Sequence, residues 1–300
     1  MKLISKEIES KFGKKILFNE KLANYSWFNL GGVSEVFFKP NSIKDLIFFL
    51  KKVKPEKITI LGAGSNTLIR DGGVKGIAIK LSSYFSYLNL ESPNIVEAGA
   101  ATLDKKIADF ALENSLTGLE FLSCIPGSIG GGIKMNSGCY GEDISKILHS
   151  IKIIDILGVE KDIPASDIKF YYRDSSIDHN LIITSVKLLG QISTKEKIQK
   201  KQQNLIERKK NSQPSQIKTC GSTFKNTKNK KAWELIRESN CQNLQVGNAK
   251  ISDKHCNFFV NDGKATAKDL EDLINKVKEK VFLKSKTNLE LEIKIIGDNV

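Results

Sequence analysis

Glycine is concentrated in two short stretches of this chain. Residues 61–76 read LGAGSNTLIRDGGVKG and residues 118–141 read GLEFLSCIPGSIGGGIKMNSGCYG, and together they hold 12 of the 22 glycines. Fixing a glycine costs backbone entropy, so such clusters need a structural reason. The usual reason is a backbone that turns tightly or approaches a ligand closely. Two such loops predict a large anionic cofactor held by main-chain N–H groups.

The first glycine stretch lies between two apolar segments that read as strands, Ile58–Leu61 and Ile77–Leu81. A dinucleotide fingerprint needs a third glycine and a following helix, but Thr67 stands in that glycine's place. A Walker phosphate loop needs Gly-Lys followed by Ser or Thr, which this stretch lacks. Both patterns are therefore excluded, and a glycine-rich hairpin without a ligand stays open as an alternative. Ser65 and Asn66 favour a ligand, because hydroxyl and amide groups suit phosphate oxygens.

The second glycine stretch begins with an apolar run, Leu119–Ile125. Pro126 then fixes one φ angle. The glycines of residues 127–132 let the backbone lie against a flat partner. The alternative is a helix start whose small residues pack tightly against a sheet, and the sequence alone does not separate the two interpretations.

Composition indicates a folded chain that is large enough for two domains. It has 300 residues, of which 40% are hydrophobic and 27% are charged. No apolar run approaches the ~20 residues of a membrane span, and the first residues do not resemble a signal peptide, so we expect a cytoplasmic protein without membrane contact. The 5 cysteines include no C-x-x-C pair, so we expect neither a disulfide framework nor a metal site.

The net charge of +13 allows a competing hypothesis. Residues 187–240 carry 14 Lys and Arg against 4 Asp and Glu, and a basic face of that size could bind nucleic acid. However, residues 194–211 read as a lysine-rich helix with a solvated face, and no aromatic residues are interleaved with the charges as base stacking requires. A basic surface also attracts nucleotide cofactors and nucleotide sugars, so we expect no nucleic-acid partner.

Periodicity and capping residues predict alternating strands and helices. Ser42 is the expected N-cap of a helix over 42–53, Thr102 of a helix to Glu113, and Thr266 with Asp269 of a helix to Val281. Further helices are expected over 194–211 and 231–238. Strands are expected over 34–38, 58–61, 77–81, 94–98, 150–156 paired with 159–163, 181–189, 258–260 and 289–296. The domain boundary is placed near residue 190.

Seven sequence blocks in order resemble the UDP-N-acetylenolpyruvoylglucosamine reductases, the MurB family of bacterial peptidoglycan synthesis. Besides the two glycine stretches they are WFNLGG (27–32), YYRDSS (171–176), CGSTFKN (220–226), ISDKHCNFFVN (251–261) and LELEIKIIG (289–297). The blocks cover nearly the whole chain. Departures from the family pattern are Thr227, where the family commonly has proline, Cys124, where it often has glycine, and a loose match over 239–252.

The resemblance implies an α+β fold with two domains. Residues 1–190 would form an FAD-binding domain of the vanillyl-alcohol oxidase and p-cresol methylhydroxylase type, and residues 191–300 a smaller α+β substrate-binding domain. The short chain resembles the type of the family that lacks an extra tyrosine-bearing loop. We expect a monomer.

The implied reaction reduces the enolpyruvyl ether of UDP-N-acetylglucosamine enolpyruvate to the lactyl ether of UDP-N-acetylmuramate. Non-covalent FAD would take hydride from NADPH and pass it to C3, and a proton would reach C2. Two other readings stay open: a different FAD-dependent oxidoreductase of the same fold, and a basic nucleic-acid-binding protein.

The resemblance also implies roles for individual residues. Arg173 would face the substrate carboxylate, Ser222 would give the proton to C2, and Glu292, which must itself be protonated, would stabilise the enediolate. On sequence alone, a salt bridge, a Gly-Ser turn and a solvent-facing strand residue are the alternatives. The residues expected to hold FAD are Gly62, Gly64, Ser65, Asn66, Ile125, Pro126, Gly127, Ser128, Gly130 and Gly131. Those expected to contact the nucleotide sugar are Tyr172, Arg208, Asn226 and His255.

Overall fold

The computed structural model describes residues 3–54, 56 and 58–300. The chain forms two compact units: unit 1 comprises residues 1–18, 36–63 and 76–209, and unit 2 comprises residues 19–35, 64–75 and 210–300. The chain therefore enters unit 2 twice before its final segment. Each unit has its own hydrophobic core. The functional assignment of residues 1–190 and 191–300 stays a prediction.

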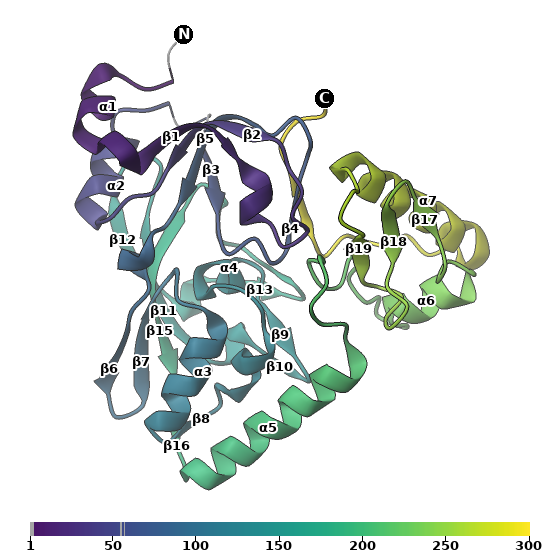
Figure 1. Ribbon diagram of the computed structural model, residues 1–300. Helices are drawn as coiled ribbons and strands as arrows, with labels where there is room; N and C mark the ends of the chain where they lie inside the picture. The colour runs from purple at the N-terminus through teal and green to yellow at the C-terminus, as the bar shows by residue number, and fades with distance from the viewer. Residues whose placement is uncertain (1–2, 55, 57) are drawn as a thin grey trace. The chain divides into compact units, whose positions relative to one another are not determined.

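An antiparallel five-stranded sheet is the centre of unit 1 (Figure 1). Its order is β12-β11-β15-β7-β6. The strands are β6 (Leu88–Ser92), β7 (Ile95–Gly99), β11 (Leu148–Ile154), β12 (Glu160–Pro164) and β15 (Ile182–Leu189). The expected β11–β12 hairpin is confirmed, with Ile151 opposite Ile163. Its turn is held by Asp155, whose Oδ1 accepts from the N–H groups of Leu157 and Val159.

Helices α3 (Asp104–Glu113) and α4 (Ile129–Lys134) share a core with this sheet. Ile107 of α3, Ile129 of α4 and Val186 of β15 are all fully or almost fully buried there. The expectation that Thr102 caps α3 is wrong. Leu103 is the N-cap, without a side-chain cap, because the Thr102 hydroxyl donates instead to the Tyr87 carbonyl oxygen at 3.1 Å.

A second core of unit 1 is built on stacked phenylalanines. Phe38 and Phe49 stack with ring centroids 4.1 Å apart, and Phe12 packs 4.9 Å from Phe38. The helices here are α1 (Lys6–Phe12) and α2 (Ile43–Leu50), and Ser42 caps α2 as predicted by accepting from the Asp45 N–H. The associated four-stranded sheet has the order β1-β2-β5-β3. Its strands are β1 (Ile16–Lys21), β2 (Val33–Phe38), β3 (Ile58–Leu61) and β5 (Val74–Lys80).

Unit 2 packs two helices against short strands. The helices are α6 (Ala232–Glu238) and α7 (Ala267–Ser285), and the strands are β17 (Gln245–Val246), β18 (Ala249–Ile251), β19 (Phe259–Asn261) and the parallel pair β4 (Thr67–Ile69) and β20 (Lys294–Ile296). The predicted capping box of Thr266 and Asp269 is confirmed. The expected strand over 289–296 is only partly formed. Residues 294–296 are strand, while Leu291 makes an isolated bridge to Phe224.

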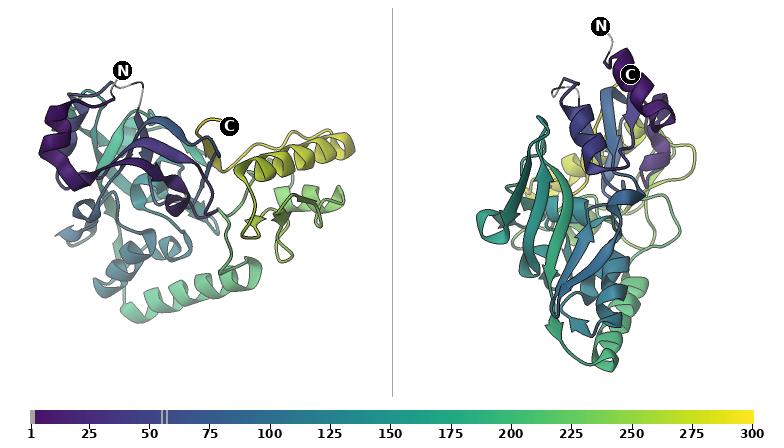
Figure 2. Two further views of the ribbon diagram at one scale, coloured as in Figure 1. Left: turned by 45° about the horizontal axis from the view of Figure 1, so that its top comes forward. Right: turned by 90° about the vertical axis from the view of Figure 1, so that its left-hand side faces the viewer.

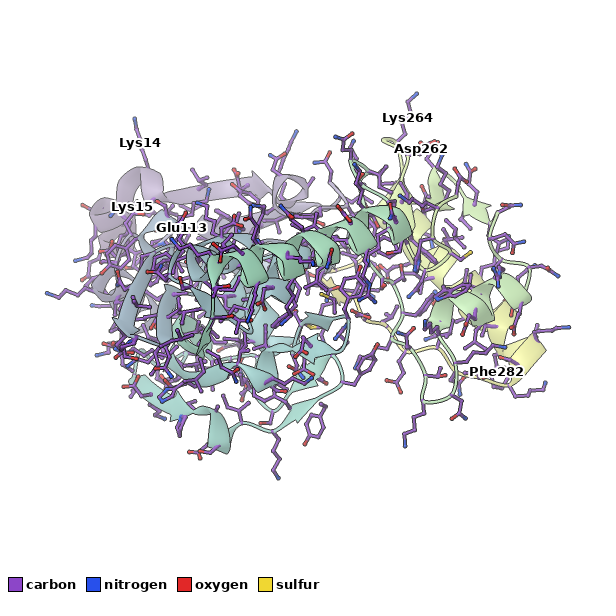
Figure 3. All side chains as sticks on the ribbon, turned by 90° about the horizontal axis from the view of Figure 1, so that it is seen from below. Lys14, Lys15, Glu113, Asp262, Lys264 and Phe282 are labelled. Atoms are coloured by element: carbon purple, nitrogen blue, oxygen red, sulfur yellow. The ribbon has the colours of Figure 1, made fainter. Side chains whose placement is uncertain are left out.

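The long basic segment forms α5 (Lys195–Ser212), a single unbroken helix (Figure 2). Most of its lysines are exposed. Outside α5, the side chains of Lys14 and Lys264 extend away from the ribbon (Figure 3). Within the described residues, no helix is both long and apolar enough to cross a membrane.

The remaining elements are short. The strands are β8 (Leu116–Thr117), β9 (Gly138–Cys139), β10 (Glu142–Asp143), β13 (Phe170–Tyr171), β14 (Asp174–Ser175) and β16 (Gln191–Ile192). The 3-10 helices are η1 (Gly13–Lys15), η2 (Leu22–Tyr25), η4 (Ser83–Phe85), η5 (Glu120–Cys124), η6 (Ile144–Lys146) and η7 (Ala165–Asp167). They connect the larger elements, and Tyr172 and Arg173 lie between β13 and β14.

A carboxyl group is buried beneath α4. Asp104, the first residue of α3, has no exposed surface, and neither of its side-chain oxygens has a hydrogen-bond partner among the described residues. Gly132 of α4 lies close by, since a Cβ added there would be 3.7 Å from both oxygens. Burial raises the pKa of Asp104 to about 8, because a charge there would be desolvated. The carboxyl is therefore protonated in the folded chain at neutral pH.

The buried Asp104 carboxyl should make the free energy of unfolding depend on pH. Between pH ~4 and pH ~8 the folded chain keeps a proton that the unfolded chain has lost, so raising the pH lowers the free energy of unfolding, by at most about 1.4 kcal/mol per pH unit. Asp104→Asn has the same shape and cannot ionise. We expect this variant to gain stability over the original chain at pH 8 but not at pH 4.

Urea denaturation at several pH values measures this difference. Asp167→Asn, at an exposed position, is the matched control and should leave the pH dependence unchanged. If the free energy of unfolding of Asp104→Asn changed with pH in parallel with that of the original chain, the buried carboxyl would not retain its proton.

Candidate active site

The second glycine stretch makes main-chain contacts with the segment that leads into α3. Ser128 forms an antiparallel bridge with Leu103, and the Ile129 N–H donates to the Thr102 carbonyl oxygen at 3.0 Å. α4 begins at Ile129. The alternative interpretation, a helix start with tightly packed small residues, is therefore confirmed for this part of the stretch. Gly130 is packed tightly, since an added Cβ would lie 2.9 Å from the Ala100 Cβ.

Gly62 and Gly131 come from different glycine stretches, and both lie beside the Ser128 hydroxyl in unit 1. A Cβ added to Gly62 would meet only Ser128 Oγ, at 3.5 Å, and one added to Gly131 would meet only the same atom, at 3.9 Å. Neither glycine is therefore required by packing among the described residues. Open space beside exposed main chain is what a closely approaching ligand needs. This cradle of Gly62, Ser128 and Gly131 fits the cofactor that the sequence predicts.

Residues 64–75 of the first glycine stretch lie in unit 2 and have structural contacts of their own. Gly64 has a φ of +74°, and an added Cβ would lie 1.9 Å from the Tyr25 carbonyl oxygen. Its own carbonyl accepts from the Trp27 N–H at 3.0 Å. Asn66 donates through Nδ2 to the carbonyl oxygen of Glu292 at 2.9 Å. Asn66, expected to hold the cofactor, thus also fixes the main chain of a proposed catalytic residue.

Arg173 occupies a two-residue turn between β13 and β14. Its φ is +56°, an uncommon value for a residue with a side chain. Arg173 Nη2 donates to the Gly138 carbonyl oxygen at 2.5 Å, and its guanidinium lies 5.0 Å from the Tyr172 ring centroid. Asn136 also ties this hairpin down by donating to the Tyr171 carbonyl oxygen at 3.0 Å. Strained residues that the surroundings hold in place concentrate at functional sites.

Arg208 is the other candidate substrate contact in unit 1 besides Tyr172. It lies on α5 with its guanidinium 4.4 Å from the Tyr140 ring centroid. A cavity of about 480 Å³ opens beside it. Its lining residues are Tyr140, Glu142, Lys197, Lys200, Lys201, Asn204, Leu205 and Arg208. The aromatic ring holds the arginine head in a defined place, and the neighbouring lysines give the cavity a positive charge.

Ser222 and Glu292 belong to neighbouring extended segments of unit 2. The Glu292 N–H donates to the carbonyl oxygen of Thr223, the residue after Ser222, at 2.9 Å. Ser222 is itself bridged to Phe258 on a third segment. Ser222 and Glu292 are both half-buried, whereas Thr223, which follows Ser222, is fully buried. The structure thus brings these two predicted catalytic residues together by main-chain pairing.

Asn257 holds the Ser222 segment in place and is a residue that sequence reasoning missed. Its Oδ1 accepts from the Phe224 N–H at 3.0 Å, and its Nδ2 donates to the Phe224 carbonyl oxygen at 2.8 Å. Its own carbonyl oxygen accepts from the Thr223 N–H at 2.8 Å. The side chain is 3% exposed, so these bonds are shielded from water. Asn257 precedes three apolar residues of an expected strand, and nothing in that pattern predicts that its side chain binds another segment.

His255 and Asn226 lie on the same segments of unit 2. His255 Nδ1 accepts from the Asn257 N–H at 3.2 Å, and its ring lies 4.7 Å from that of Phe258. Burial lowers the pKa of His255, so the imidazole is neutral at neutral pH. Asn226 Oδ1 accepts from the N–H of Ala232, the first residue of α6. The two side chains therefore have structural bonds besides any contact with a ligand.

The predicted site residues divide between the two units. Unit 1 brings Gly62, the 125–131 loop, Tyr172, Arg173 and Arg208 into one fold, and unit 2 does so for Gly64, Ser65, Asn66, Ser222, Asn226, His255 and Glu292. Among the described residues, no group of three or more His, Cys, Asp or Glu could hold a metal ion. The residues present suit an anionic organic cofactor and proton transfer.

Two family models match this chain. Residues 34–161 match an FAD binding domain, and residues 213–296 match the C-terminal domain of UDP-N-acetylenolpyruvoylglucosamine reductase. These ranges bear out the expected α+β fold class, an FAD-binding domain followed by a second, smaller domain.

Proteins named as this reductase are similar to the chain over nearly its whole length. The UDP-N-acetylenolpyruvoylglucosamine reductase of Pelagibacter ubique is 45% identical over 295 residues, 97% of this chain and 98% of that protein. That of Orientia tsutsugamushi is 42% identical over 283 residues, 93% of each. The crystal structure of UDP-N-acetylenolpyruvylglucosamine reductase (MurB) from Thermus caldophilus superimposes with a TM-score of 0.83, at 30% identity, covering 94% of this chain and 98% of that one.

Asn257→Asp tests the clamp on the Ser222 segment. The substitution keeps the shape but replaces the N–H donor to the Phe224 carbonyl with an acceptor, which leaves two buried oxygens facing each other. We expect the free energy of unfolding to fall by about 1–3 kcal/mol in urea denaturation. Asn229→Asp, at an exposed position, is the control and should have little effect. Equal stability of the two variants would contradict the clamp.

Proposed function

Because this chain belongs to the UDP-N-acetylenolpyruvoylglucosamine reductase family, we propose that it reduces UDP-N-acetylglucosamine enolpyruvate to UDP-N-acetylmuramate with NADPH, a step of peptidoglycan precursor synthesis. The observation that carries this proposal is the joint presence, in one chain, of an FAD-binding domain over 34–161 and the reductase's C-terminal domain over 213–296. The chain is an FAD-dependent, NADP-linked oxidoreductase of cell-wall synthesis.

FAD is proposed to lie against the cradle formed by the two glycine stretches. When bound, it supplies the hydride that reduces the substrate, having received it from NADPH. The cradle is formed by Gly62, Ser128 and Gly131, where main chain is exposed beside open space. The other residues proposed to hold it are Gly64, Ser65, Asn66, Ile125, Pro126, Gly127 and Gly130. The tight packing of Gly64 and Gly130 supports an indirect role for these two glycines, which fix the path of the loops.

The proposed catalytic residues act on the charge and the proton of the substrate. Arg173 places a fixed cation at the substrate carboxylate, and its hydrogen bond to the Gly138 carbonyl oxygen holds the guanidinium. Ser222 donates the proton to C2, which a hydroxyl can do only to a strongly basic carbanion close by. Glu292, protonated, donates a hydrogen bond to the enediolate. The main-chain bond between Glu292 and Thr223 supports joint action of the serine and the glutamic acid.

Tyr172, Arg208, Asn226 and His255 are proposed to bind the nucleotide sugar. Arg208 supports this role through its place beside a basic cavity, because the diphosphate is an anion. Nδ1 of His255 accepts from the Asn257 N–H, so the neutral ring carries its proton on Nε2 and can donate a hydrogen bond to the ligand.

We further propose a monomeric protein of the cytoplasm. All five cysteines are free thiols, which is typical of a reducing compartment. NADPH and the nucleotide sugar also have to be available in the same compartment. Light scattering of the purified protein tests the oligomeric state, and a mass of 33.4 kDa would support the monomer.

Product analysis tests the reaction directly. The purified protein with FAD, NADPH and UDP-N-acetylglucosamine enolpyruvate should consume both substrates in equal amounts. The product should be heavier than the substrate by two hydrogens, as a lactyl ether requires. NADPH consumption without this product would indicate a different flavin oxidoreductase of the same fold.

Gly131→Ala separates cofactor binding from folding. Alanine is favoured over glycine inside a helix by about 0.5–1 kcal/mol, and nothing but the Ser128 hydroxyl stands near the new methyl group. We expect the apoprotein to be at least as stable as before and the affinity for FAD to fall at least about tenfold, as measured by fluorescence titration and thermal unfolding. Gly130→Ala, which meets Ala100, should instead destabilise the apoprotein. Unchanged FAD affinity in Gly131→Ala would remove this glycine from the site.

Ser222→Ala and Glu292→Gln test proton transfer. Reduction of the bound flavin by NADPH should be unaffected, whereas its reoxidation by the enolpyruvyl substrate should slow by about 10²–10⁴-fold, the range for loss of a general acid. Stopped-flow absorbance measures each half-reaction separately. Ser285→Ala, at an exposed position of α7, is the control. Near-normal reoxidation in either variant would exclude the proposed role of that residue.

A further inference from the structure

Two cysteines of unit 1 lie together next to the loop proposed to hold the cofactor. Cys124 ends η5 and directly precedes Ile125, and Cys139 ends β9. The two thiols lie close enough to interact with each other. Neither residue has a part in the proposed reaction. A contacting pair of thiols raises the question of redox chemistry, which a single cysteine would not.

The contacts of Cys139 place it against η5, the 3-10 turn that ends at Cys124. Cys139 Sγ lies 3.5 Å from the carbonyl oxygen of Phe121, three residues before Cys124 in η5. On the other side, the Ser123 hydroxyl lies 3.8 Å from Cys124 Sγ. Cys139 has a single S–H, which can donate either to the Phe121 oxygen or to the Cys124 sulfur. In the second arrangement Cys139 stabilises a thiolate at Cys124.

The surroundings of the pair distinguish the two sulfurs. The interaction with Cys139, opposed by burial and assisted by Ser123 and the charge of Lys209, lowers the pKa of Cys124 below its usual value. Lys209 is held in place because its Nζ donates to the Cys124 carbonyl oxygen at 2.9 Å. The same thiol–thiol interaction, together with burial, raises the pKa of Cys139. Cys124 is therefore the nucleophile of the pair and Cys139 the proton-bearing partner.

We propose that Cys124 and Cys139 form a peroxide-responsive dithiol, in which Cys124 is oxidised first and Cys139 then closes an intramolecular disulfide. The Cys124 thiolate attacks one oxygen of hydrogen peroxide, and the O–O bond breaks to give Cys124 sulfenic acid and hydroxide, which takes up a proton as water. The Cys139 sulfur then attacks the Cys124 sulfur. The S–O bond breaks, the Cys139 proton leaves with the hydroxyl group as a second water, and the two-electron oxidation is complete.

The other buried cysteines lack this arrangement. Cys220 is 2% exposed, and its thiol lies 3.5 Å from the Gly64 and Thr67 carbonyl oxygens. Burial raises the pKa of Cys220 to about 11 and also raises that of Cys241. Both thiols are therefore protonated at neutral pH and poor nucleophiles. Peroxide oxidation should accordingly select Cys124.

Thiol mapping of the full-length protein tests this proposal. After brief exposure to hydrogen peroxide, the protein is alkylated under denaturing conditions and digested, and the peptides are identified by mass spectrometry. We expect two of the five thiols to become protected, with the peptides of Cys124 and Cys139 joined by a disulfide. Dithiothreitol should restore both thiols. Cys139→Ser should accumulate a sulfenic acid at Cys124 that dimedone traps.

The control is Cys256→Ser, which removes a partly buried cysteine of unit 2 and should still form the disulfide. Circular dichroism checks that each variant is folded, and the peptide map of the unaltered chain is decisive if a variant is not. Two results would overturn the proposal: Cys124 and Cys139 both remaining open to alkylation while another cysteine is oxidised, or a disulfide that joins two chains.

Discussion

Close approach of one main chain to another is the constraint on which much of this structure depends. At Gly64 and Gly73 an added Cβ would lie 1.9 and 2.0 Å from the carbonyl oxygens of Tyr25 and Val33, distances that no side chain can accommodate. These contacts join the first glycine stretch to the residues on either side of the WFNLGG segment within unit 2. They explain why the chain carries so many glycines there. Gly62 and Gly131 differ, since the space beside them is open.

Main-chain contact also organises the proposed catalytic residues of unit 2. Ser222 and Glu292 lie far apart in sequence, and the segments that carry them pair through the bond between Glu292 and Thr223. Two asparagine side chains reinforce this pairing: Asn66 binds the carbonyl of Glu292, and Asn257 binds both main-chain groups of Phe224. A buried amide that satisfies main-chain groups, as Asn257 does, makes the backbone around it rigid. Placing a proton donor accurately requires such rigidity.

The sequence was most informative where a local signal was strong. The N-cap Ser42, the capping box at Thr266 and the β11–β12 hairpin depend on residues close together in the chain, and all three were predictable. The prediction that Thr102 is an N-cap failed because its hydroxyl donates to the carbonyl oxygen of Tyr87, outside the local helix start. Neither composition nor periodicity predicted that residues 19–35 and 64–75 belong to unit 2. The role of Asn257 depends on pairing between remote segments, which a single sequence does not encode visibly.

The central claim is that this chain passes electrons from NADPH through FAD to an enolpyruvyl nucleotide sugar. An anaerobic visible spectrum of the purified, FAD-loaded protein tests it most directly. The account predicts a flavin band that disappears with one equivalent of NADPH and returns in full with one equivalent of UDP-N-acetylglucosamine enolpyruvate. A protein that cannot be loaded with FAD, or a reduced flavin that the enolpyruvyl compound leaves colourless, would contradict the account.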